Sequence, residues 1–244
     1  MILLIDIGNT NIVYSLYDGN NYIMNKRIAP EENIQNIIKV LSNYTINHIA
    51  IASVVPKITS IYLKLFKEKL NIESFVVSYQ NANINLMIDS KKEVGPDRIC
   101  NVKSAIEKTK RSCIVIDFGT ATTYDVINDK QEFIGGAIAP GIQVSGAYLI
   151  KKAALLKDTL LEFPKNYIGK NTATNIQSGI MYSAVHAIEG MVLHIKKELG
   201  NKTDIILTGG FSKLISPKLS FEHKVEKNLT IEGIKLIYEE NLNE

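Results

Sequence analysis

The feature that most constrains the fold is a pattern that occurs twice, about half the chain apart. The apolar run Ile2 to Ile7 leads into Asp6-Ile7-Gly8-Asn9-Thr10, and a later apolar run leads into Asp117-Phe118-Gly119-Thr120. A second strand follows each copy, at Ile12 to Tyr17 and at Tyr124 to Ile127. Chance is the alternative, since apolar strands ending in Asp-x-Gly are common. The matching strand order favours a duplication into two similar halves, because solenoid repeats are shorter, roughly 20–50 residues.

Each half is expected to contain a sheet flanked by helices. The first strand is apolar throughout and is therefore expected at the centre of its sheet. Apolar spacing predicts the helices, and short β-branched runs predict the strands. The boundary between the halves is expected near Lys110 to Ser112, giving domains 1–111 and 112–244. The expected strands are 2–7, 12–17, 22–28, 48–54, 74–77, 113–116, 124–127, 133–139 and 204–207, and the expected helices are 31–44, 57–70, 97–108, 176–199 and 231–240.

Composition excludes several classes of protein. The 244 residues are 45% hydrophobic and 22% charged, which is typical of a globular protein and not of a disordered one. The net charge of +3, without a dense basic face, gives no indication of nucleic-acid binding. The first apolar run is too short for a signal peptide or a membrane span. Cys100 and Cys113 form no CxxC pair and are expected in the core, as is common in the reducing cytoplasm.

Polar residues gather at the end of the first strand. The strand delivers Asp6 to a tight turn, where Gly8 lets the backbone approach a ligand closely. Asn9, Thr10 and Asn11 add donors to the same turn. Such a turn can hold a phosphate, and the carboxylate can position a hydrated Mg²⁺. Taken alone, the segment is equally compatible with a polar hairpin turn that binds nothing.

The second copy and a later glycine pair make the first turn more specific. Asp117 can ligate a cation, and Thr120 can bond a phosphate oxygen. Gly209-Gly210 follows an apolar strand and leaves bare backbone against which an adenine ring can lie. In this order the three elements resemble the actin, sugar-kinase and Hsp70 ATPase superfamily. The resemblance implies an α/β protein with an actin-like ATPase fold: two ribonuclease H-like halves, each a mixed sheet flanked by helices. No GxxxxGK[ST] loop occurs.

A carboxylate and a guanidinium are adjacent at an expected helix start, in Gly95-Pro96-Asp97-Arg98. Arg98 can bind a carboxylate through two hydrogen bonds, and Asp97 can accept a proton from a hydroxyl. An aspartate in a first helical turn is also a common partner of the helix dipole, so the motif alone leaves both readings open.

With this motif the chain resembles the type III pantothenate kinases from its first residues to near its C-terminus. The family pattern is usually GADR, and this chain differs there only at Pro96. The motifs that carry the resemblance are Asp6-Ile7-Gly8-Asn9-Thr10, Gly95-Pro96-Asp97-Arg98, Ile116-Asp117-Phe118-Gly119-Thr120-Ala121-Thr122, Gly135-Gly136-Ala137-Ile138-Ala139-Pro140-Gly141 and Gly169-Lys170-Asn171-Thr172.

The resemblance implies a role for each site residue. Asp97 is the expected general base, and Asp117 is the expected ligand of a monovalent cation, K⁺ or NH₄⁺. Pantothenate is expected to contact Gly95, Pro96, Asp97, Arg98 and Thr172. ATP is expected to contact Asp6, Ile7, Gly8, Asn9, Thr10, Asn11, Ile12, Val13 and Thr120.

The resemblance also implies the partners. ATP with Mg²⁺ and pantothenate are the expected substrates, in the first step towards coenzyme A. A cytoplasmic homodimer is expected, with pantothenate sites near the subunit interface and with no nucleic-acid or membrane partner. Many family members have a tyrosine where this chain has Ile88, which leaves that one pantothenate contact unassigned.

Two other functions remain open. The same ATPase fold could phosphorylate a sugar or another small hydroxyl compound, although Gly95-Pro96-Asp97-Arg98 argues against this. A nucleotide-binding regulator without turnover is the other possibility. An inactive site is argued against by the presence together of Asp6, Asp97, Arg98, Asp117 and Thr172.

Overall fold

The structure is a computed structural model that describes residues 1–32, 34–153, 159–200 and 202–242. The chain forms two compact units. Unit 1 contains Met1–Lys108 and Asn228–Glu244, and unit 2 contains Thr109–Lys227. No helix in the described ranges is both long enough and apolar enough to span a bilayer.

Unit 1 is built on a mixed five-stranded sheet in the order β3-β2-β1-β4-β5. The antiparallel meander β1 (Ile2–Ile7), β2 (Ile12–Tyr17) and β3 (Tyr22–Ile28) forms one side of it. β4 (His48–Ser53) and β5 (Ser74–Val76) continue parallel to β1. β1 is thus central, as its continuous apolar run predicts.

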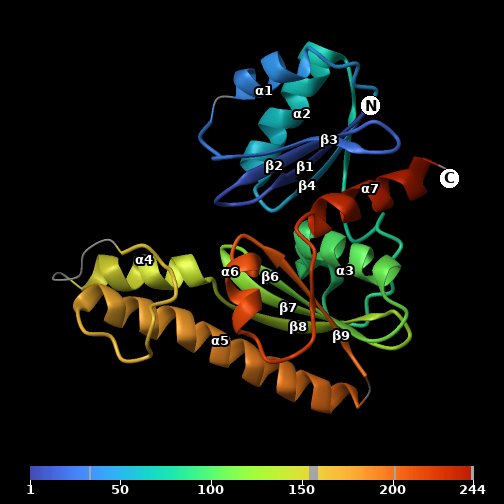
Figure 1. Cartoon of the computed structure of the whole chain (residues 1–244). Coiled ribbons are helices and arrows are strands. Elements are labelled where there is room, and N and C mark those ends of the chain that lie inside the picture. The colour runs from blue at the N-terminus through green and yellow to red at the C-terminus, as the bar shows by residue number, and fades with distance from the viewer. Residues whose placement is uncertain (33, 154–158, 201, 243–244) are drawn as a thin grey trace. The chain divides into compact units, whose positions relative to one another are not determined.

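Helices cover both faces of this sheet (Figure 1). α1 (Ile34–Leu41) and α2 (Pro56–Leu70) pack on one face, and α7 (Leu229–Leu242) contacts β1, β2 and β4 from the other. α3 (Pro96–Lys108), which follows the short 3₁₀ helix Lys91–Glu93, packs against α7. The core between β1, β4, α1 and α2 includes the buried side chains of Leu3, Ile5, Ile7, Ile37, Leu41, Ile49, Ile51, Tyr62 and Phe66.

Unit 2 repeats the same sheet in the order β10-β9-β6-β7-β8. Its meander is β6 (Cys113–Phe118), β7 (Ala121–Ile127) and β8 (Phe133–Pro140). β9 (Asp204–Gly209) and the two-residue β10 (Lys224–Val225) extend it parallel to β6. The identical strand order confirms the predicted mixed α/β class for both halves.

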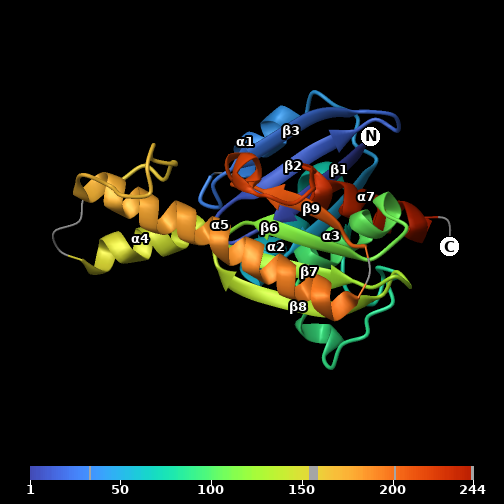
Figure 2. The ribbon, with the colours of Figure 1, turned by 60° about the horizontal axis from the view of Figure 1, so that its bottom comes forward.

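The helices of unit 2 are less evenly sized than those of unit 1. α4 (Ile142–Lys152) lies beside α5 (Thr172–Leu199), a helix of 28 residues that crosses one face of the sheet (Figure 2). The short α6 (Ser212–Ile215) and the 3₁₀ helix Ser216–Lys218 follow β9. The core on this face includes Ile114, Ile116, Phe118, Tyr124, Met181, Val185, Ile188, Ile205 and Leu207.

The structure differs from the sequence predictions in several places. The helices α4 and α6 and the strand β10 were not predicted, and residues 228–244 lie in unit 1 although the predicted division put them in the second half. The reason for the last difference is that α7 packs on α3 and on the first sheet. Both cysteines are buried and unpaired, as expected.

Candidate functional site

The turn after β1 is closed by its own backbone. The Gly8 N–H donates to the Asn11 carbonyl at 3.0 Å, and a Cβ at Gly8 would lie 3.1 Å from that oxygen. Asn9 and Thr10 are exposed, so the tip of the turn is available to a ligand. The Val54 N–H donates to the carbonyl of the last β1 residue, which holds the end of β4 beside the turn.

The Gly95-Pro96-Asp97-Arg98 motif starts α3. Pro96 is the first helical residue, where an N–H would have no partner within the helix, so the missing donor costs nothing there. A Cβ at Gly95 would lie 2.4 Å from the Asp97 Oδ1 and 3.3 Å from the Val54 Cγ1. The Arg98 N–H donates to that Oδ1 at 2.8 Å. Gly95 therefore makes room for the Asp97 carboxylate, and the Arg98 amide fixes its orientation.

The charges of Asp97 and Asp6 both act on one buried thiol. Burial raises the pKa of Asp97, an effect partly offset by the amide and the charge of Arg98. The pKa of the buried Cys100 thiol is raised well above its usual range, first by burial and then by the charges of Asp6 and Asp97. Cys100 lies one helical turn after Asp97. The end of β1 and the first turn of α3 thus place two carboxylates around one buried thiol.

In unit 2, Asp117 lies against bare backbone. Asp117 pairs with Thr208 in the parallel β6–β9 register. The next β9 residue, Gly209, has a φ of +84°, and a Cβ there would lie 2.3 Å from the Asp117 Oδ1 and 2.6 Å from the Phe118 nitrogen. Only glycine fits both this conformation and this space. The Gly210 N–H then donates to the Phe118 carbonyl at 2.9 Å.

The turn after β6 is supported by the end of β8. The Gly119 N–H donates to the Ala121 carbonyl, and the Gly141 N–H donates to the Thr120 carbonyl, both at 3.0 Å. A Cβ at Gly141 would lie only 2.4 Å from the Thr120 oxygen. Thr120 itself is exposed. The sequence motif that ends in Gly141 therefore allows a close backbone contact that fixes the Thr120 turn.

Thr172 is the first residue of α5 and is exposed. Asn171 caps the helix: its Oδ1 accepts from the Thr174 N–H at 2.9 Å. The Thr174 hydroxyl oxygen in turn accepts from the Lys170 and Asn171 N–H groups. The segment that carries Thr172 is thus a well-capped helix start in unit 2.

A cavity of about 280 Å³ lies in unit 2, between β7, β8, α4 and α5, and sequence reasoning did not predict it. Its lining includes four residues that carry hydroxyl groups, Thr122, Tyr124, Ser145 and Ser183, and the other lining residues are small or apolar. Neither Asp117 nor the glycines that contact it belong to this lining. α4 was not predicted as a helix, so a space between two helices could not be expected here.

The structure groups the predicted site residues into two sets. In unit 1 the charges of Asp6 and Asp97 act on the same Cys100 thiol, and in unit 2 Asp117 lies against Gly209. Ile7 and Ile12 are fully buried in the core of unit 1, so only their backbone can contribute to nucleotide binding. Their predicted place in the ATP-binding segment therefore stays a prediction about backbone contacts, since an apolar strand buries the side chains that flank its turn.

Comparisons with known proteins identify the family. The sequence profile of the family described as Type III pantothenate kinase matches residues 2–194. The Type III pantothenate kinase of Syntrophus aciditrophicus is 36% identical over 99% of this chain and 100% of its own length.

Solved structures agree on the fold. A protein from Campylobacter jejuni described as a Baf family transcriptional activator superimposes with a TM-score of 0.62 at 19% identity, covering 99% of this chain and 100% of that one. An inorganic polyphosphate/ATP-glucomannokinase from Arthrobacter sp. strain KM superimposes with a TM-score of 0.52 at 15% identity, covering 100% and 99% of the two chains. These likenesses confirm the expected fold of two mixed-sheet halves, shared with sugar kinases. The family profile and the full-length sequence match show that this chain belongs to the type III pantothenate kinase family.

Proposed function

We propose that this chain transfers the γ-phosphoryl group of ATP to the primary hydroxyl of pantothenate, giving 4′-phosphopantothenate and ADP. Family membership supports the reaction. One observation supports its location: Asp97, at the first turn of α3, acts together with Asp6 on the same buried Cys100 thiol. A proton acceptor beside a phosphate-binding turn is what phosphorylation of an alcohol requires. The product would enter coenzyme A biosynthesis.

Asp97 is the general base in this proposal. Its Oδ1 accepts the Arg98 amide, so Oδ2 is the oxygen that takes the proton of the primary hydroxyl. The hydroxyl oxygen forms a bond to the γ-phosphorus while the bond from that phosphorus to the β–γ bridging oxygen breaks, and ADP leaves. The raised pKa makes Asp97 a stronger base than an exposed aspartate, provided the pH keeps it ionised.

Mg²⁺ fits the Asp6 turn. Among the described residues no group of three or more His, Cys, Asp or Glu side chains could form a complete metal cage. Mg²⁺ in phosphoryl-transfer sites is usually held by one or two carboxylates, phosphate oxygens and water. Asp6 would hold the ion through its water shell, and the ion would neutralise charge on the ATP phosphates.

Asp117 is the proposed seat of a monovalent cation, K⁺ or NH₄⁺. Its carboxylate lies in the space that a side chain at Gly209 would fill, and hard cations prefer such oxygen ligands. In the same proposal Thr120 contacts ATP, and the Asp6–Val13 segment binds its phosphates, with Ile7 and Ile12 contributing backbone atoms only.

Arg98 and Thr172 are the proposed pantothenate contacts, together with the Gly95 and Pro96 backbone. The guanidinium can bind the pantothenate carboxylate with two parallel hydrogen bonds. The hydroxyl of Thr172 is exposed at the start of α5 and is open to a polar group of the substrate. Ile88, which is partly buried, replaces the tyrosine common in the family, so no hydroxyl contact is assigned there.

A cytoplasmic homodimer is part of the proposal. Large apolar side chains are exposed on α4 and before α5, and contiguous exposed apolar surface usually marks an interaction site. Light scattering should give a mass of twice the 27.2 kDa chain, whereas a monomer at working concentration would contradict this part. The exposed side chains are Val144, Tyr148, Leu149, Leu160, Tyr167 and Ile168.

A coupled ADP-release assay tests the proposal, with ATP, Mg²⁺ and pantothenate, in the presence and absence of K⁺. We expect pantothenate-dependent ADP release that K⁺ stimulates, and ³¹P NMR should show a phosphomonoester on the primary hydroxyl. ADP release only with another alcohol would replace the acceptor. Nucleotide binding without turnover of any acceptor would favour a regulatory protein.

A further inference from the structure

Helix α7 crosses α3 at a point where only glycine fits. A Cβ at Gly233 would lie 1.9 Å from the Cys100 carbonyl oxygen and 2.4 Å from the carbonyl carbon. Both are backbone atoms of a helix, so an added methyl group cannot be accommodated by turning a side chain. Any side chain at Gly233 would have to push the two helices apart.

The two helices cross at equivalent positions, five residues into each. Cys100 is the fifth residue of α3, and Gly233 is the fifth residue of α7. α3 is the helix that follows the last strand of the first sheet, and α7 follows the last strand of the second. The two helices are therefore repeat-related, and they meet at equivalent turns.

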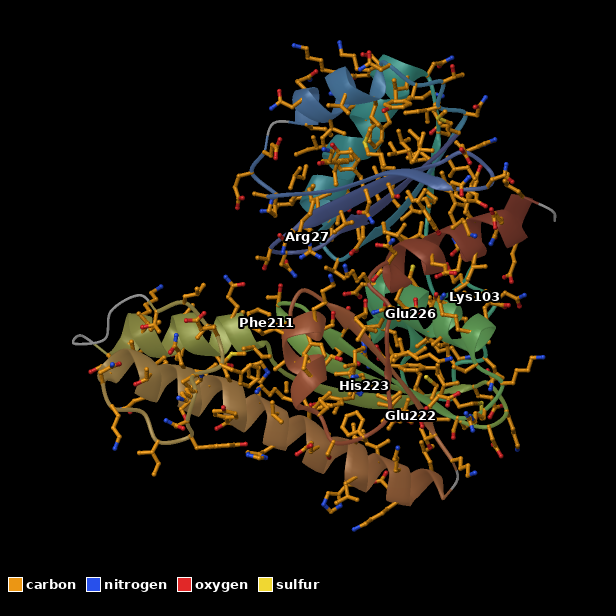
Figure 3. The ribbon with its side chains drawn as sticks, in the orientation of Figure 1. Arg27, Lys103, Phe211, Glu222, His223 and Glu226 are labelled. Atoms are coloured by element: carbon orange, nitrogen blue, oxygen red, sulfur yellow. The ribbon has the colours of Figure 1, made fainter. Side chains whose placement is uncertain are left out.

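Polar contacts hold this crossing on both sides. The Thr230 hydroxyl donates to the Oδ1 of the fully buried Asn101 at 2.8 Å. The buried Lys103 ammonium lies 2.5 Å from the Glu240 carboxylate, and Figure 3 marks Lys103 on the part of α3 next to α7. A buried lysine is costly unless it is paired, so this contact fixes which turn of α7 faces α3.

The proton acceptor is one turn away from the crossing. Asp97 precedes Cys100 by three residues, and three residues along a helix return to the same face. We propose that α7 is the positioning element of the acceptor site: Gly233 lets α7 press on Cys100, and this contact sets where the first turn of α3 holds Asp97. The proposal rests on the function proposed above. Gly233 is a positioning residue, because it acts through α3 and touches no reacting atom.

The direct test is Gly233→Ala with Gly190→Ala as its control. Gly190 lies in α5 and has open space around its Cβ position, so its replacement adds a methyl group in a helix without a clash. Gly233→Ala must move α3 by about 1 Å or more, and a misplacement of that size can lower a rate about 100-fold. We expect kcat to fall roughly 10–100-fold, with the Kd for ATP and the KM for pantothenate changed less than about twofold. Gly190→Ala should leave kcat unchanged.

A milder pair covers the case in which Gly233→Ala does not fold. Thr230→Val keeps the shape of the side chain and removes its hydrogen bond to Asn101, whereas Thr230→Ser keeps the hydroxyl. We expect kcat to fall about 3–10-fold in Thr230→Val, the range of one lost hydrogen bond, and to return to near the wild-type value in Thr230→Ser. Equal losses in both variants would contradict the proposal.

A measurement without turnover separates this proposal from the proposed function. The Arg98 amide donates to Asp97, so its ¹H–¹⁵N resonance reports on the first turn of α3. It should shift in the α7 variants Gly233→Ala and Thr230→Val but not in Gly190→Ala. If wild-type protein does not phosphorylate pantothenate, the proposed function fails while this test still stands. The role of α7 would be overturned if folded Gly233→Ala had the same kcat as the wild type and its Arg98 resonance did not move.

Discussion

The turn after β1 and the turn after β6 have the same backbone frame but different neighbours. In unit 1 the Val54 N–H donates to the Ile7 carbonyl at 3.1 Å, and in unit 2 the Gly210 N–H donates to the Phe118 carbonyl at 2.9 Å. The loops differ slightly in length: residues 8–11 separate the paired Ile7 and Ile12, and residues 119–121 separate the paired Phe118 and Thr122.

The neighbours of each turn decide its chemistry. The end of β4 carries side chains at Ser53 and Val54, and the Asp97 carboxylate and the Val54 side chain both lie close to Gly95. The end of β9 carries Gly209 and Gly210 at the matching positions, so bare backbone faces Asp117. A duplicated scaffold can thus provide acid–base side chains in one half and a close-fitting backbone in the other. The following predictions test that division.

Asp97→Asn should have the largest effect. Loss of the general base is expected to lower kcat about 10²–10⁴-fold, because the amide cannot accept the hydroxyl proton. The Kd for ATP should stay within about twofold of wild type. The matched change in unit 2, Asp117→Asn, should mainly raise the KM for ATP and abolish K⁺ stimulation. Steady-state kinetics with and without K⁺ measure both effects. The assignment would be contradicted if Asp117→Asn lost kcat while Asp97→Asn raised the KM for ATP and lost K⁺ stimulation.

Gly209→Ala and Ser53→Ala occupy matching positions and should behave differently. Alanine at Gly209 would clash with Asp117 and adopt a left-handed backbone at a cost of about 1–2 kcal/mol, so we expect at least a roughly tenfold loss of ATP affinity. Ser53→Ala removes an oxygen that accepts from Val55 and Thr59, and should cost about 1 kcal/mol of stability with ATP affinity retained. Calorimetric titration measures the ATP affinity, and thermal unfolding measures the stability. Equal ATP affinities of the Gly209→Ala and Ser53→Ala variants would contradict the expected difference between the two positions.

The pH dependence should report the burial of Asp97. Because burial raises its pKa, the acid limb of kcat/KM should lie above the pH expected for an exposed aspartate, and activity should fall as the pH falls through it. The stability effect has the opposite direction: the folded state binds this proton more tightly than the unfolded state, so ionised Asp97 destabilises the fold at neutral pH. Asp97→Asn should therefore unfold at a higher temperature than wild type at pH 7.5, and the difference should shrink towards pH 4. A constant difference would contradict the raised pKa.

The smallest effect is expected from the turn glycines themselves. A Cβ at Gly8 would lie 3.1 Å from the Asn11 oxygen, whereas a Cβ at Gly119 would lie an ordinary 3.6 Å from the Ala121 oxygen. Gly8→Ala should cost about 0.5–1 kcal/mol in the protein without nucleotide, and Gly119→Ala should be close to neutral. Denaturant unfolding measures both, and a larger cost for Gly119→Ala would show that the two turns are packed differently.

Much of the fold follows from local patterns in the sequence. The meanders and the central strands were predicted because apolar β-branched runs end at turn residues in both halves. α4 was missed because Pro140, Gly141 and Gly146 are typical of a loop, and β10 is only two residues long. The placement of α7 in unit 1 could not be predicted either, since it depends on Gly233 packing against Cys100, far away in the sequence.

The site was partly predictable for the same reason. Asp6 and Asp97 were identified from their positions at a strand end and a helix start, and the charges of both act on the Cys100 thiol in unit 1. Only the structure explains why residue 95 is a glycine: the Asp97 carboxylate occupies the space that a side chain there would fill. Ile7 and Ile12 were assigned to ATP as part of a motif, but an apolar strand directs such side chains into the core.

The central claim is that one half supplies the acid–base side chain and the other supplies the close-fitting backbone. Its most direct test measures ATP binding and the single-turnover rate in both Asp97→Asn and Gly209→Ala. Asp97→Asn should bind ATP like wild type and fail to transfer phosphate to pantothenate, even with every site filled. Gly209→Ala should bind ATP weakly and, once saturated, transfer phosphate at close to the wild-type rate. Loss of ATP binding in Asp97→Asn, or a normal single-turnover rate in that variant, would contradict the account.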